Sequence, residues 1–202
     1  MLLNPYTQVK FLKSAAQVKQ LPDDTGYEVA FAGRSNAGKS SALNCLTGIH
    51  RLARTSKTPG RTQLINLFSL PDNQRRLVDL PGYGYAKVGL SIKKSWQDNL
   101  AHYLDVRKSL QGLVLLMDIR HPLKELDQTM INWALCRQLP VHVLLTKSDK
   151  LSKGQVKNTV LQVKKRYADS EELITIQAFS SLRKQGVDEL ILVINRWLGI
   201  HD

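Results

Sequence analysis

The octapeptide from Gly33 to Ser40 constrains the fold of this chain more than any other feature. It reads G-x-x-x-x-G-K-S, and it stands between a short apolar run at 29–32 and a stretch with helical spacing at 41–46. A strand, a glycine loop and a helix in this order surround a phosphate with backbone N–H groups and with the positive end of the helix dipole. The octapeptide therefore predicts a nucleoside triphosphate site, in which Lys39 reaches the β- and γ-phosphates and the Ser40 hydroxyl binds Mg²⁺.

Further apolar runs predict an α/β fold. Strand-like runs lie at 63–68, 76–80, 112–117, 141–145 and 173–178, and helical patterns lie near 92–108, 124–137, 153–167 and 186–198. Near-continuous apolar strands separated by helices are typical of a mainly parallel sheet covered on both faces. The short link at 69–74, with Pro71-Asp72-Asn73 as turn residues, predicts a hairpin. We therefore expect a mixed, mainly parallel six-stranded sheet with helices on both faces.

The length of the chain fits one domain. We expect residues 25–202 to form that domain and residues 1–24 to be an N-terminal extension packed on it. The sequence shows neither an 18-residue apolar run nor a signal pattern, so we expect a cytoplasmic monomer without a transmembrane segment. Cys45 and Cys136 both fall in apolar helical settings, which favour buried free thiols.

The charge balance indicates a polyanionic partner. The 202 residues include 29 Lys or Arg and 17 Asp or Glu, which gives a net charge of +12. Such an excess suits a partner whose condensed counterions are released on binding. A merely soluble basic protein would share this composition, and an anionic membrane surface is a third reading, although no amphipathic basic helix stands out.

A second motif, Asp79-Leu80-Pro81-Gly82, follows the apolar run that ends near residue 80. An acidic residue at the end of a strand can hold Mg²⁺ through a water molecule, and the Gly82 N–H can meet a γ-phosphate. The spacing from the phosphate loop strengthens a motif that is weak by itself.

A third motif, Thr146-Lys147-Ser148-Asp149, follows the apolar run at 141–145 and predicts guanine recognition. The Asp149 carboxylate can accept from both N1–H and N2–H of guanine, whereas adenine would leave it unpaired. The Lys147 stem can lie along the base and the ribose. After the last apolar run, backbone N–H groups of Phe179-Ser180-Ser181 can meet guanine O6, although an ordinary Ser-rich turn explains this segment equally well.

The polar stretch at 49–62 is long for a loop in a compact domain, and such loops are usually functional. Thr62 is placed to add a hydroxyl to Mg²⁺ and a backbone N–H to the γ-phosphate, but Thr55 and Thr58 are competitors that spacing does not exclude. The loop also carries four basic residues, namely Arg51, Arg54, Lys57 and Arg61.

Taken in order, these motifs resemble the translation-factor-related GTPases, and among them the EngB family (also called YihA or YsxC) of the TrmE-Era-EngA-EngB-septin-like superfamily. The resemblance rests on residues 33–41, 55–63, 79–86 and 146–149, with support from 117–122 and 179–186. It implies a P-loop GTPase of the Ras-like G-domain fold, a role in large ribosomal subunit assembly, and a link to division-septum formation.

The resemblance also implies a set of site residues. Those implied to bind GTP or GDP are Gly33, Arg34, Ser35, Asn36, Ala37, Gly38, Lys39, Ser40, Ser41, Gly60, Arg61, Thr62, Gln63, Leu64, Asp79, Leu80, Pro81, Gly82, Thr146, Lys147, Ser148, Asp149, Phe179, Ser180 and Ser181. Lys39, Thr62 and Gly82 are the expected catalytic residues, and Ser40, Thr62 and Asp79 are the expected Mg²⁺ residues.

Two positions depart from Ras-type enzymes or extend the site. Tyr83 stands where a Gln would orient the attacking water, so we expect slow unassisted hydrolysis, stimulated by a partner or a monovalent cation. Asn36 matches the phosphate-loop asparagine that coordinates K⁺ in related GTPases; an asparagine that only stabilises the loop is the alternative. The sequence leaves open whether Arg54 or Arg61 acts as an arginine finger.

Basic residues gather in the 49–62 loop, at Lys93-Lys94, and from Lys147 to Arg166. They are candidates for contact with the large ribosomal subunit or its rRNA, with a solvated helix face as the alternative. Two functions therefore remain: a GTP-dependent switch in ribosome assembly, or a GTP-sensing scaffold at the division septum whose hydrolysis is incidental.

Overall fold

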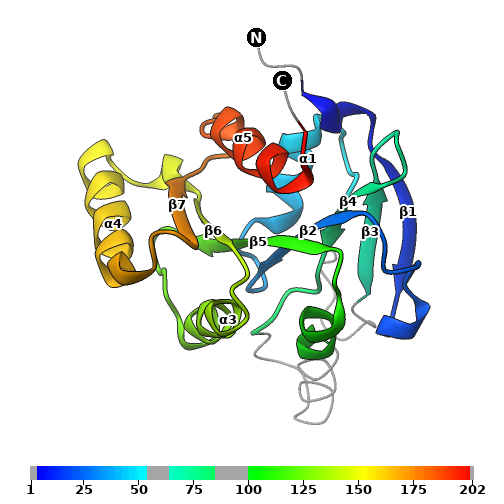
Figure 1. Ribbon diagram of the computed structural model, residues 1–202. Coiled ribbons are helices and arrows are strands. Elements are labelled where there is room, and N and C mark those ends of the chain that lie inside the picture. Colours follow the sequence, from blue (N-terminus) through cyan, green and yellow to red (C-terminus); the bar gives the residue numbers. More distant parts are fainter. Residues whose placement is uncertain (1–3, 54–63, 85–99, 201–202) are drawn as a thin grey trace.

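The computed structural model describes residues 4–53, 64–84 and 100–200 (Figure 1). Its strands are β1 (Lys10–Ala15), β2 (Tyr27–Gly33), β3 (Ile65–Ser69), β4 (Arg75–Asp79), β5 (Leu110–Asp118), β6 (Val141–Thr146) and β7 (Ile174–Ala178). Its helices are α1 (Lys39–Thr47), α3 (Glu125–Cys136), α4 (Lys153–Arg166) and α5 (Val187–Leu198). Residues 100–106 are also helical. Short 3₁₀ turns lie at η1 (Pro5–Gln8), η2 (Val18–Gln20), η3 (Ser148–Lys150) and η4 (Ala168–Ser170).

The described strands form one sheet in the order β1-β3-β4-β2-β5-β6-β7. β2 is parallel to β4 and β5, and β6 is parallel to β5 and β7, whereas β3 is antiparallel to both β1 and β4. The mixed, mainly parallel sheet and the β3–β4 hairpin are thus confirmed.

The expected number of six strands was wrong, because the residues that the structure describes form a sheet of seven. The missing strand is β1, which comes from residues 1–24 and pairs with β3 at the edge of the sheet. Most of its side chains are exposed, and Phe11 and Leu12 are among the exposed large apolar residues of the described chain. An edge strand of this kind lacks the continuous apolar run that reveals a buried strand.

Helices cover both faces of the sheet, as predicted (Figure 1). Alternate residues of β2 serve two separate cores: Val29 and Phe31 pack with α1 and α5, whereas Ala30 and Ala32 pack with α3 and the 100–106 helix. Because successive side chains of a strand point to opposite faces, a strand buried on both sides must be apolar throughout. This explains why β2 is so easily recognised in the sequence.

The apolar pattern at 186–198 predicts a buried stripe of Leu190, Ile191, Val193, Ile194 and Trp197. In α5, Leu190, Ile191 and Ile194 are buried, whereas Val193 and Trp197 are only partly buried. The expectation of two buried thiols was wrong: Cys45 is half-buried, and Cys136 is exposed at the end of α3, outside the buried stripe of that helix. Within the described residues, no helix is long and apolar enough to cross a membrane.

A buried ion cluster lies where the central strand β2 begins, at the opposite end of this strand from the phosphate loop. Glu28 is fully buried, and its carboxylate accepts from the Arg107 guanidinium at 2.7 Å, the Arg76 guanidinium at 3.1 Å and the Tyr103 hydroxyl at 3.1 Å. Arg107 and Arg76 also donate to backbone carbonyls of Pro22 and Thr25. The cluster therefore joins β2, β4, the 100–107 segment and the turn that precedes β2.

His142, buried in β6, predicts a loss of stability in acid. Its Nδ1 lies 2.7 Å from the Thr175 hydroxyl oxygen and its Nε2 lies 2.7 Å from Gln177 Oε1. Burial lowers the pKa of His142 from 6.5 to about 4. The unfolded chain thus takes up this proton more readily, so stability present above pH 6.5 is lost as the pH falls toward 4, by about 3 kcal/mol.

Urea unfolding at a series of pH values measures this effect. His142→Gln should show a shallower fall in unfolding free energy between pH 6.5 and 4 than the wild type. Equal slopes in the two proteins would assign the acid sensitivity to other groups.

Candidate nucleotide site

The phosphate loop joins β2 to α1 in the predicted order. Gly33 packs closely on β5, because a Cβ at this position would lie 2.7 Å from the Leu116 carbonyl oxygen. Asn36 and Gly38 then adopt left-handed backbone conformations, with φ of 65° and 93°. The Gly38 carbonyl accepts from Ala42 N–H and so caps α1. The loop therefore presents backbone N–H groups and the N-terminus of α1 at the carboxyl end of the sheet.

Lys39 and Asp79 meet beside this loop. The Lys39 ammonium donates to Asp79 Oδ1, and both side chains are largely buried. Lys39 begins α1 and Asp79 ends β4, so the pair forms because the parallel strands β2 and β4 end at the same edge. This contact places a cation suited to phosphate oxygens directly against a carboxylate suited to Mg²⁺.

The D-x-x-G turn is attached to the phosphate loop by backbone hydrogen bonds. Tyr83 N–H donates to the Gly33 carbonyl at 3.2 Å, and Ser35 N–H donates to the Tyr83 carbonyl at 2.7 Å. Gly82 lies against the same loop, since a Cβ there would be 3.5 Å from Ser35 N. Within this turn Leu80 is buried, whereas Pro81 and Gly82 are partly exposed.

The T-K-S-D segment also contacts the phosphate loop. The Thr146 hydroxyl donates to the Ala37 carbonyl at 2.6 Å and lies 3.0 Å from that of Met117. The Lys147 ammonium donates to the Asn36 carbonyl at 2.8 Å. The two segments that were predicted to read base and phosphates are therefore hydrogen-bonded to each other.

Asp149 is oriented by the loop that follows β7. The Ser180 hydroxyl donates to Asp149 Oδ1 at 2.6 Å, and the Phe179 carbonyl accepts from Ser148 N–H at 3.1 Å. The hydrogen bond from Ser180 is the main cause that lowers the pKa of Asp149, so the carboxylate is ionised at neutral pH. Ser180 itself is fully buried, so it has few alternative orientations.

Asp118 is a site residue that the sequence motifs did not single out. It ends β5, and its Oδ2 accepts from the Lys147 ammonium at 3.0 Å and from the Arg120 guanidinium at 2.6 Å. The hydrogen bond from Arg120 is the main cause that lowers the pKa of Asp118, and the bond from Lys147 adds to it, so the carboxylate stays charged. In the sequence, Asp118 could have been recognised by its position at the end of an apolar strand, within the 117–122 segment.

The structure brings most of the predicted site together at the carboxyl edge of the parallel strands. Ser41 is exposed on α1, Ser181 accepts a weak Cys45 thiol hydrogen bond through its carbonyl, and Leu64 precedes β3. Gly60, Arg61, Thr62 and Gln63 lie outside the described residues, as do Arg54, Thr55, Lys57, Thr58, Lys93 and Lys94.

Among the described residues, Ser40 and Asp79 are the expected Mg²⁺ residues. No group of three or more His, Cys, Asp or Glu side chains that could hold a metal occurs in the described part of the chain. Ser40 and Asp79 offer hard oxygen atoms beside the phosphate loop. Mg²⁺ usually takes one or two such protein ligands and completes its octahedron with phosphate oxygens and water.

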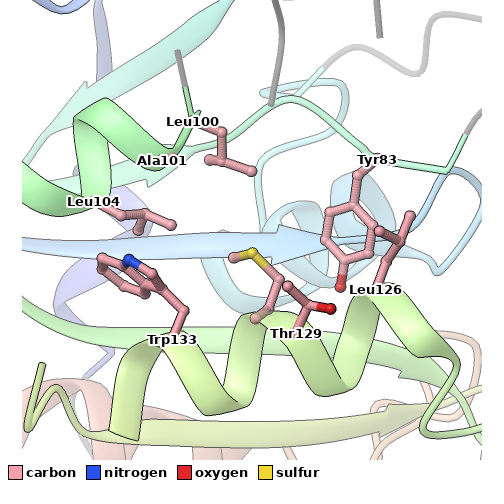
Figure 2. Close-up of a pocket in the computed structure, with 8 residues that line it drawn as sticks. Tyr83, Leu100, Ala101, Leu104, Leu126, Thr129 and Trp133 are labelled. Carbon is pink, nitrogen blue, oxygen red and sulfur yellow. The ribbon is translucent and has the colours of Figure 1, made fainter. Parts of the chain in front are cut away.

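An apolar cavity of about 230 Å³ lies behind the D-x-x-G turn, between α3 and the 100–106 helix (Figure 2). The Tyr83 ring forms part of its wall together with side chains of these two helices. The described residues that line it are Tyr83, Leu100, Ala101, Leu104, Leu126, Thr129, Met130 and Trp133. Trp133 also donates from its indole N–H to Asp105 at 3.2 Å.

The fold and these joined segments define a P-loop GTPase domain. A sequence model of the family described as "50S ribosome-binding GTPase" matches residues 28–147. The chain is 53% identical to a probable GTP-binding protein EngB of Hydrogenovibrio crunogenus and 56% identical to one of Alteromonas mediterranea. Each match covers 96% of this chain, and 91% and 92% of the respective relatives. The chain belongs to the EngB family of GTP-binding proteins, and it is a GTPase.

Solved structures show the same fold. A crystal structure of a probable GTP-binding protein engB matches with a TM-score of 0.69 and 20% identity, over 86% of this chain and all of that chain. A crystal structure of Aquifex aeolicus Era matches with a TM-score of 0.64 and 23% identity, over 86% of this chain and 57% of that chain.

Proposed function

We propose that this GTPase hydrolyses GTP slowly and acts in the cytoplasm as a nucleotide-dependent switch in large ribosomal subunit assembly. The assembled site supports the first half of this proposal, since the phosphate loop, D-x-x-G turn and T-K-S-D segment are hydrogen-bonded to one another. The description of the matching family, a 50S ribosome-binding GTPase, supports the second half.

Each group at the site has a proposed role. Lys39 neutralises phosphate charge, Gly82 donates its N–H to the γ-phosphate, and Asp149 selects guanine. Ser40, Asp79 and Thr62, the last of which lies outside the described residues, would hold Mg²⁺, which neutralises charge that develops on the phosphates. Asn36 is the proposed K⁺ contact.

The slow rate follows from Tyr83. Its hydroxyl donates to the buried Asp127 carboxylate at 2.7 Å, so the side chain points into the protein rather than toward an attacking water. No amide or carboxylate takes the place of the Ras-type Gln at this position. We expect hydrolysis to rise when a partner or K⁺ supplies the missing stabilisation.

The observation that carries the ribosomal proposal is the exposed basic face of α4. Lys153, Lys157 and Lys164 lie within about 40° of one another around the helix and span about 16 Å along it. All three are exposed, and α4 contains no acidic residue. Lys165 and Arg166 extend the charge at its end. A row of ammonium groups on one face is suited to the phosphates of an RNA strand.

Sedimentation with purified large and small ribosomal subunits tests the proposal. The full chain with a GTP analogue should sediment with the large subunit more strongly than the chain with GDP, and rising salt should release it. Replacing Lys153, Lys157 and Lys164 with Glu should reduce the slope of log affinity against log salt by about 2 to 3.

A matched control is Lys10→Glu with Lys13→Glu on β1, at the opposite edge of the sheet from β7 and α4. If the chain does not sediment with the large subunit, and its sedimentation is the same with the GTP analogue and with GDP, the assembly switch is contradicted. A nucleotide-dependent protein partner without rRNA affinity would favour a division-site scaffold instead.

A further inference from the structure

Tyr83 has contacts in the nucleotide site already described and also a contact outside it. Its backbone bonds with Gly33 and Ser35 fix the residue after Gly82 to the phosphate loop. Its side chain is 2% exposed and extends away from this loop toward α3 (Figure 2). The residue that follows Gly82 is therefore attached to α3 as well as to the phosphate loop.

The partner on α3 is Asp127, which is 1% exposed. One carboxylate oxygen accepts from the Tyr83 hydroxyl at 2.7 Å, and the other accepts from Lys124 N–H at 3.1 Å, which caps the first turn of α3. The side chain cannot turn without losing the cap. Asp127 therefore gives the Tyr83 hydroxyl a fixed anchor on α3.

A buried carboxylate is a costly anchor. Desolvation raises the pKa of Asp127, against the hydrogen bond from Tyr83 and the positive charges of Arg34 and Lys124. Simple packing of Tyr83 against α3 would be served equally well by an apolar pair, at lower desolvation cost. Unlike an apolar contact, the hydrogen bond from the Tyr83 hydroxyl to Asp127 is directional and so fixes the orientation of the phenol ring.

The cavity behind the turn shows why this direction needs selecting. The Tyr83 ring forms part of the wall of the space of about 230 Å³, beside Leu104, Leu126 and Trp133. Because the ring borders this space, side-chain packing does not enclose it on that side, and the bond to Asp127 restrains its hydroxyl end. Gly82 adjoins Tyr83 and lies against the phosphate loop, where a Cβ would be 3.5 Å from Ser35 N, so a shift of Tyr83 would change the position of Gly82 relative to this loop.

From this geometry we propose that Asp127 is a positioning residue: through the Tyr83 hydroxyl it holds the Gly82 N–H where a γ-phosphate is received. The inference rests on the proposed role of Gly82. Since GDP lacks the γ-phosphate, the bond favours GTP over GDP. Loss of the bond should therefore weaken GTP binding selectively, by about tenfold relative to GDP.

Tyr83→Phe is the central test, because it removes the hydroxyl and keeps the ring. Fluorescence titration of the purified full chain with labelled GDP and with a labelled non-hydrolysable GTP analogue gives the ratio of the two affinities. Tyr83→Phe and Asp127→Ala should each shift this ratio by about tenfold toward GDP. Asp127→Asn should restore much of the ratio, because its carbonyl can cap Lys124 N–H while its amide donates to the Tyr83 oxygen.

Tyr103→Phe is a matched control. Tyr103 is also a buried phenol that donates to a buried carboxylate, Glu28. Glu28 lies near the start of β2, about 16 Å from Gly33 along the strand. This variant should lose stability in thermal unfolding and keep the ratio of affinities. An unchanged ratio in Tyr83→Phe, with a similar loss of stability, would overturn the inference alone. A wild-type chain that binds neither nucleotide would overturn the proposed function and the inference together.

Discussion

Asp149→Asn is expected to convert the nucleotide preference of this protein from GTP to XTP, with GTP affinity reduced about 10³- to 10⁴-fold. The Ser180 hydroxyl donates at 2.6 Å to Oδ1 of residue 149, so an asparagine there should turn its carbonyl toward Ser180. Its amide then faces the base. With guanine, the asparagine amide would face the N2–H group, so that two donors oppose each other. With xanthine, the carbonyl at C2 accepts a hydrogen bond from the amide.

Competition titration with GTP, XTP and ATP measures this change in one experiment. Asp169→Asn is the control, because Asp169 is an exposed carboxylate on η4 that follows α4. It should leave all three affinities unchanged. Retention of GTP preference by Asp149→Asn would show that a different group reads the base, and gain of ATP binding would argue against guanine specificity from this segment.

Glu28→Ala should destabilise the fold by about 3–5 kcal/mol. The substitution leaves the Arg76 and Arg107 guanidinium groups buried without the carboxylate that both contact. It also leaves the buried Tyr103 hydroxyl without its acceptor. The cost arises from these desolvated donors rather than from the removed ion pairs themselves. Urea unfolding monitored by circular dichroism measures the difference in unfolding free energy.

Asp105→Ala provides the contrasting ion pair. Asp105 accepts from Arg137 at 2.6 Å, a geometry as short as that in the Glu28 cluster, but both side chains are about half exposed. Water replaces the lost contact there, so the change in stability should be far smaller. Comparable losses in the two variants would mean that burial does not set the worth of these pairs.

Much of the fold was predictable because its strands are buried on both faces. β2 packs Val29 into one core and Ala30 into the other, so its sequence is apolar without interruption. β1 was not predictable on the same ground: it lies at the sheet edge and its residues are mostly exposed. Its pairing with β3 depends on backbone hydrogen bonds, which any sequence without proline can make.

The site divides in a similar way. Lys39, Asp79 and Asp149 stood out because their chemistry requires those residue types at those spacings, and the structure places each at the end of a strand or the start of a helix. Asp118 and Asp127 did not stand out. Each acts through a partner distant in sequence, Lys147 or Tyr83, and no local pattern marks such a contact.

The sequence by itself therefore determined the class of protein, the nucleotide and the alternation of strands and helices. These depend on local spacing and on periodicity, which a linear chain displays directly. Only the tertiary structure decided how the segments are joined: Ser180 orients Asp149, and Asp127 anchors the residue beside Gly82. Such bonds form between residues that folding alone brings together, and their value comes from burial, which a sequence does not display.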